Sequence, residues 1–187
     1  MSEPILIYRV KVSGFWSTRH DIEAETPEGK REPVGRLAIQ RNWHGMVVRG
    51  EYTPVKGEPI TFRRDPGLLR SQFSIWTDGR EWLGSSLRWG WLKRTIEVST
   101  STANKPYQLV PVHGWARGWR LVAPKTGVAA RVRSGFLGRS ASVEVYRRLD
   151  ADIAVFAHFV GWQIQGESFW PGSVLADEFT APKPSKA

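Results

Sequence analysis

Cations alternate with indole rings at two places in the middle of the sequence. Residues 88–94 read Arg-Trp-Gly-Trp-Leu-Lys-Arg, and residues 115–120 read Trp-Ala-Arg-Gly-Trp-Arg. A guanidinium binds phosphate through paired N–H donors, and an indole beside it stacks on a base or enters a lipid interface. The competing interpretation places the tryptophans in a core and the arginines at alternating solvent positions. In the second segment, strand alternation puts Trp119 and Leu121 on one face and Arg120 on the other.

The positive charge of the chain is concentrated in its middle. The net charge is +9 over 187 residues, and residues 70–148 contain 14 Lys and Arg against 4 Asp and Glu. Such a field attracts phosphate on lipids, nucleic acids or nucleotides, although an arginine-rich solvated surface gives the same count. Arg131 and Arg133 are expected to share a strand face, opposite Val132. The expected anion-binding residues are Arg88, Lys93, Arg94, Arg117, Arg120, Arg131 and Arg133.

The sequence contains no pattern typical of catalysis or metal binding. There is no Cys, and His20, His44, His113 and His158 form no His-x-x-x-His pair. Disulfides, thiolate catalysis and Cys-ligated metals are therefore excluded. Nucleophile-elbow and phosphate-loop motifs are absent as well. We predict a protein that is not an enzyme, with no catalytic residue, no metal site and no cofactor, and we expect His158 to be a satisfied core residue.

Three segments of the sequence are similar, so the chain contains a repeat. Their turn glycines, Gly29, Gly79 and Gly127, are spaced about 50 residues apart. Each lies in a polar turn between two runs with strand character, and Asp78-Gly79 favours a hairpin because the turn needs positive φ. Further strand signals follow each hairpin, to a total of roughly eleven or twelve strands. We predict a mainly β fold, a closed antiparallel barrel of roughly twelve strands, because closure removes exposed sheet edges.

An apolar segment predicts one buried C-terminal helix at about residues 151–165. Asp150 and Asp152 precede residues 153–164, which are apolar on almost every face. Aspartate is a good helix N-cap, and a helix that is apolar all round must be buried all round. A central β-strand and an interfacial membrane anchor are the alternative interpretations. We expect the helix to fill the barrel, with Gly161 allowing close approach of a strand. The expected lumen side chains are Phe156, Phe159, Val160 and Trp162.

The layout resembles the tubby C2-like superfamily, whose members include tubby-like, LURP-one-related and phospholipid scramblase proteins. The most specific matches are the hairpins at residues 71–84 and 118–133 and the segment at residues 149–164. The resemblance spans about residues 19–164. It implies a twelve-stranded barrel around a buried helix, and phosphoinositide binding by basic residues on the barrel exterior.

The resemblance to scramblases also raises calcium as a ligand. Leu149-Asp150-Ala151-Asp152 is similar to part of an acidic segment that precedes the helix in scramblases. Calcium takes six to eight oxygen ligands, so two carboxylates are few, and we expect Asp150 and Asp152 to cap the helix instead. The cysteine-rich lipidated stretch of scramblases is absent, which argues against lipid scrambling.

Together these features predict one domain over residues 1–175 and a flexible tail at residues 176–187. We expect no signal peptide and no transmembrane span, in a cytoplasmic protein that is peripheral to the membrane. The expected function is to bind anionic phosphate groups, such as phosphoinositide or other lipid headgroups, at a membrane surface. The alternatives are nucleic-acid binding through the Arg/Trp-rich middle section and small-molecule or sugar binding by the barrel.

Overall fold

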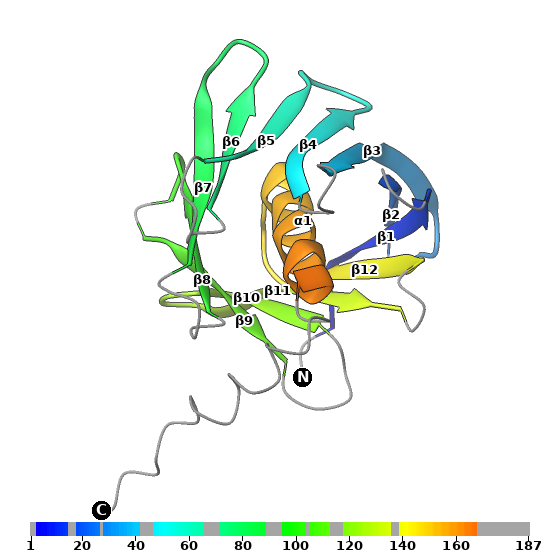
Figure 1. Ribbon diagram of the computed structural model, residues 1–187. Helices are drawn as coiled ribbons and strands as arrows, with labels where there is room; N and C mark the ends of the chain where they lie inside the picture. Colours follow the sequence, from blue (N-terminus) through cyan, green and yellow to red (C-terminus); the bar gives the residue numbers. More distant parts are fainter. Residues whose placement is uncertain are drawn as a thin grey trace, which may run out of the picture.

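A closed β-barrel surrounds one helix in the computed structural model (Figure 1). The structure describes residues 3–14, 18–26, 28–41, 47–65, 72–88, 95–103, 105–112, 118–135 and 139–167. Within these ranges, twelve antiparallel strands follow one another around the barrel, and β1 closes it by pairing with β2 and β12. The predicted fold class is confirmed. The elements are β1 (Leu6–Ser13), β2 (Thr18–Glu25), β3 (Arg31–Arg41), β4 (Val47–Pro54), β5 (Ile60–Arg64), β6 (Phe73–Thr77), β7 (Trp82–Arg88), β8 (Ile96–Thr100), β9 (Tyr107–Pro111), β10 (Gly118–Ala123), β11 (Gly127–Ser134), β12 (Ser140–Val145) and α1 (Ala151–Glu167).

The helix α1 fills the barrel (Figure 1). Every side chain from Ile153 to Val160 is at most 6% exposed. The ring centroids of Phe62 and Phe159 lie 5.0 Å apart, and those of Phe73 and Phe159 also lie 5.0 Å apart. Strands from one side of the barrel therefore pack directly on the helix. The interpretations of this segment as a central strand and as an interfacial anchor are wrong.

Asp150 begins the helix through its backbone. Its carbonyl oxygen accepts hydrogen bonds from the N–H groups of Ile153 and Ala154, both at 3.1 Å. In the described residues the Asp150 and Asp152 side chains make no hydrogen bond to the first turn, so the predicted side-chain cap is absent there. Burial, and next the charge of Asp150, raise the pKa of the Asp152 carboxyl above its usual value.

The sequence repeat corresponds to three sets of four strands. Gly29, Gly79 and Gly127 lie at the hairpins β2–β3, β6–β7 and β10–β11. One detail of the prediction is wrong: in the β6–β7 turn the residue with positive φ is Arg80, at 66°, and not Gly79. The N–H of Arg80 donates to the Thr77 carbonyl at 3.0 Å, which makes the turn one residue longer than an Asp-Gly hairpin.

The structure adds a strand, β1, that none of the predicted segments includes, although burial alternates along it from Tyr8 to Lys11. The predicted tail at residues 176–187, and residues 168–175 before it, lie outside the described residues.

Candidate functional site

Three of the seven predicted cations lie together on the outer face of β10 and β11. Trp119, Leu121 and Val132 are buried in the core, so alternation directs their neighbours outward. Arg120 is paired directly opposite Arg131. Arg133 follows on the same face as Arg131 and is more exposed. The side chains that lie outside the described residues are those of Arg88, Lys93, Arg94 and Arg117.

Neither Arg120 nor Arg131 forms an ion pair with a described carboxylate. Like charges directly opposite on neighbouring strands repel each other. The Nε atom of Arg120 is buried and has no hydrogen-bond partner among the described residues. Glu144 is paired with Arg131 in register. Its two carboxylate oxygens, however, bind Arg133 Nε at 3.1 Å and the Tyr146 hydroxyl at 2.7 Å. An anion placed at this pair would offset the repulsion.

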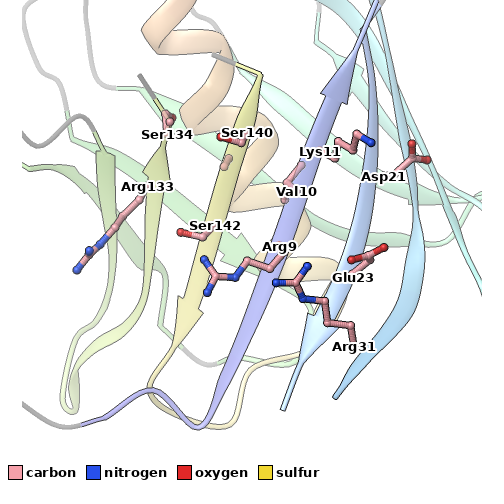
Figure 2. A pocket seen from close by; sticks show the side chains of 12 residues that line it. Arg9, Val10, Lys11, Asp21, Glu23, Arg31, Arg133, Ser134, Ser140 and Ser142 are labelled. Atoms are coloured by element: carbon pink, nitrogen blue, oxygen red, sulfur yellow. The ribbon is translucent and has the colours of Figure 1, made fainter. Parts of the chain in front are cut away.

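A shallow hollow of about 610 Å³ lies beside this pair, on the outer face over β3, β2, β1, β12 and β11 (Figure 2). Its walls bring cations and hydroxyl groups together. Asp21 and Glu23 also line it, and Asp21 is bound to Arg36 Nε at 2.7 Å. Its cations are Arg9, Lys11, Arg31 and Arg133, and its hydroxyls belong to Ser134, Ser140 and Ser142.

Ser142 lines the hollow between two arginines. It pairs with Arg9 of β1 on one side and with Arg133 of β11 on the other. Adjacent strands are about 4.8 Å apart, so a small serine between two long side chains forms a trough about 10 Å wide between the flanking Cα atoms. Figure 2 shows the Arg9 guanidinium extending over β12 toward Ser142, whereas the Arg133 side chain points away from it.

Carboxylates hold both guanidiniums by their Nε atoms. Arg9 Nε donates a hydrogen bond to Glu25 at 2.6 Å, and Arg133 Nε forms an ion pair with Glu144 at 3.1 Å. The hydrogen bond from Arg9 lowers the pKa of the Glu25 carboxyl, so this carboxylate stays charged and keeps Arg9 in place. The side chains of Arg9 and Arg133 remain 47% and 53% exposed. Their terminal nitrogens are the groups that a phosphate oxygen would contact.

The described residues offer no metal site and no membrane-spanning helix. No cluster of three or more His, Cys, Asp or Glu side chains in the described residues could hold a metal ion. Among the described residues, no helix is both long enough and apolar enough to cross a membrane. His158 lies in the core as predicted, but its Nδ1 atom has no hydrogen-bond partner among the described residues.

Sequence reasoning missed Arg9, Lys11, Ser140 and Ser142. Arg9 and Lys11 alternate with Tyr8 and Val10, which is a strand signal. The local sequence of β1 and that of β12 do not show that the two strands are neighbours. The prediction of barrel closure would have paired the first and last strands and so could have found the site.

Comparisons with known proteins support the fold. No family model matches the chain, and no curated protein matches it. The chain is similar to the X-ray structure of a protein from Arabidopsis thaliana, with a TM-score of 0.51 and 15% sequence identity. The similarity covers 89% of this chain and 94% of that chain. At this identity the comparison defines the class of protein by its fold alone, a closed barrel around a central helix.

Proposed function

We propose that this protein is a non-enzymatic barrel module that binds anionic phosphate groups on the outer face of β10, β11, β12 and β1. The observation that supports it most directly is the Arg120–Arg131 pair, two directly opposed cations that form no ion pair with a described carboxylate. The row Arg9–Ser142–Arg133 lies next to it. Arginine binds phosphate oxygens through two parallel N–H donors, and a serine hydroxyl adds a third donor.

We propose a phosphorylated lipid headgroup at a membrane surface as the source of the phosphate, for a protein peripheral to the membrane. The site is a shallow hollow on a sheet face, so the ligand would be a compact headgroup with the rest of the lipid outside. The similarity to the Arabidopsis protein covers 89% of this chain and is compatible with kinship to the tubby C2-like superfamily. We include that kinship in the proposal.

Co-sedimentation with phosphatidylcholine vesicles tests the proposal, with and without added phosphatidylinositol phosphate. We expect binding to require the phosphorylated lipid. The variant Arg120→Gln/Arg131→Gln should weaken it about tenfold or more, since each charge-assisted hydrogen bond contributes about 1.5–3 kcal/mol. Inositol phosphate without acyl chains should compete if the headgroup alone is recognised.

A second opposed arginine pair provides a matched control. Arg49 of β4 and Arg63 of β5 are also direct partners, but Glu51 binds Arg49 Nε at 3.2 Å. The variant Arg49→Gln/Arg63→Gln removes the same charge from another part of the barrel and should retain most of the binding. Equal losses in both variants would mean a diffuse charge effect. Binding to neutral vesicles alone, or a preference for single-stranded oligonucleotides, would contradict the proposal.

A further inference from the structure

Two histidines far apart in the sequence meet inside the barrel. His20 on β2 is 0% exposed and His158 on α1 is 1% exposed. The distance between His20 Nδ1 and His158 Nε2 is 2.9 Å, which is a hydrogen bond. Trp162, one helical turn after His158, lies edge-on to the His20 ring at 5.0 Å between centroids. The pair is therefore a polar contact between the helix and the barrel wall.

The contact needs both imidazoles to be neutral. A neutral imidazole has one N–H donor and one acceptor nitrogen. Because His158 Nδ1 has no partner among the described residues, we assign its proton to Nε2, which donates to His20 Nδ1. The remaining proton of His20 is then on Nε2 and donates to Thr18 Oγ1 at 3.1 Å. One chain of hydrogen bonds runs from the helix through His20 to the start of β2.

An additional proton has no favourable position in this chain. On His20 Nδ1 it would face the N–H of His158, and on His158 Nδ1 it would be a buried charged donor without a described partner. A proton bound at either nitrogen would raise the free energy of the closed contact, because a buried charge must be paired. In this respect the pair differs from an ordinary core histidine.

Among the described residues, no negative charge contributes to the pKa shift of either imidazole. In register beside His20, β1 and β3 place the apolar side chains of Val12 and Leu37. Arg41, at the end of β3, is positively charged and interacts electrostatically with His20. Burial lowers the pKa of both imidazoles, and His158 and Arg41 lower that of His20 further. No described carboxylate acts on either ring.

We propose that the His20–His158 contact is an acid-released latch, which joins the central helix to strand β2 while both imidazoles are neutral and opens when either takes up a proton. When the His20–His158 contact opens, the part of α1 from His158 onward is released from β2. Thr18 can keep its hydrogen bond from His20 Nε2 when the contact opens, because both residues lie on β2. In the described residues the core around the helix is otherwise mainly apolar and contains no further buried histidine.

Hydrogen exchange on the full chain tests the latch. Protection factors of α1 from His158 onward should fall between pH 7.5 and pH 5.0, while those of β5 to β9 stay nearly constant. For a group with an ordinary pKa of 6.5 in the open state, the opening constant at pH 5 rises about 25-fold per imidazole relative to pH 7. The double variant His20→Gln/His158→Gln should remove this pH dependence. The control His44→Gln/His113→Gln, which changes the other two histidines, should retain it.

A second measurement covers the case in which the double variant does not fold. Imidazole NMR signals of the wild-type protein should show His20 and His158 neutral from pH 8 to pH 5.5, as long as the latch is closed. An imidazole of the pair that titrates near 6.5 in the closed protein would overturn the proposal. So would an unchanged pH dependence in the folded double variant, or a parallel loss of protection in every strand.

Discussion

Gly161 of the central helix lies against the indole ring of Trp119 on β10. A Cβ atom on Gly161 would be 2.9 Å from Trp119 Cδ1 and 3.3 Å from Cγ. Both residues are buried, Trp119 at 4% exposure, so neither the ring nor the helix can move aside freely. The expectation that a glycine at this position lets a strand approach closely is confirmed.

Gly161→Ala should therefore destabilise the protein, although alanine is the better helix former. Overpacking a close contact costs about 1–3 kcal/mol, which exceeds the gain of about 1 kcal/mol in helix propensity. Urea unfolding measures the change. Trp119→Phe in the same chain should recover part of the loss, because the smaller ring makes room. An increase in stability for Gly161→Ala alone would show that the indole yields easily.

Arg80→Gly should stabilise the protein by about 0.5–1 kcal/mol. Arg80 has a φ of 66°, a region that costs a side-chain-bearing residue about 1–2 kcal/mol, and glycine avoids this penalty at a smaller entropic loss. The equivalent position of the β2–β3 turn is Gly29, with a φ of 82°. In both turns the N–H of this residue donates to the threonine three positions earlier, Thr77 or Thr26.

The matched control for this turn is Gly29→Ala, measured by thermal unfolding. A Cβ on Gly29 would meet no atom within 4 Å, so any loss comes from the backbone conformation alone. The two substitutions should shift the midpoint in opposite directions. Shifts of the same sign would indicate that the Arg80 side chain contributes more than its backbone geometry.

Tyr52 makes stability fall in alkaline solution. Burial, together with Asp152 and Tyr8, raises the pKa of the Tyr52 hydroxyl to about 12. The unfolded chain loses this proton near pH 10, whereas the folded protein keeps it. The free energy of unfolding therefore falls by up to about 1.4 kcal/mol per pH unit between pH 10 and 12. Below pH 10 the contribution is fully present.

Tyr52→Phe should flatten this alkaline decline, measured as urea unfolding at pH 8 and pH 11. At pH 8 the variant should differ little from wild type, because the Tyr52 hydroxyl has no hydrogen-bond partner among the described residues. The control Tyr107→Phe, on β9, should retain the decline. A Tyr52→Phe protein as sensitive to alkali as wild type would place the titrating group elsewhere.

Ser142→Asp tests the trough without altering an arginine. The new carboxylate would lie between Arg9 and Arg133 and bind the terminal nitrogens that a phosphate would use. Binding to vesicles containing phosphatidylinositol phosphate should fall about tenfold or more. The control Ser99→Asp adds the same charge on β8, away from the hollow. If both variants bind equally well, the trough is not where the anion binds.

The sequence predicted the barrel and its helix because their signals are local or periodic. Each hairpin turn is a short sequence, and the apolar run of α1 is continuous. The pairing of Arg120 with Arg131 also follows from one hairpin. The hollow could not be predicted in this way, since Arg9 and Ser142 are brought together by barrel closure. The His20–His158 contact likewise depends on how the helix is rotated within the barrel.

The seam between β1 and β12 has a consequence for biosynthesis. Leu6 pairs with Val145, so the first strand leaves the ribosome long before its partner exists. Until then β1 has an unpaired edge, and the inward side chains of the other strands have no helix to cover them. We expect nascent chains that end before Ile153 to bind chaperones or aggregate. The domain would acquire its native structure only when α1 has been released into the centre.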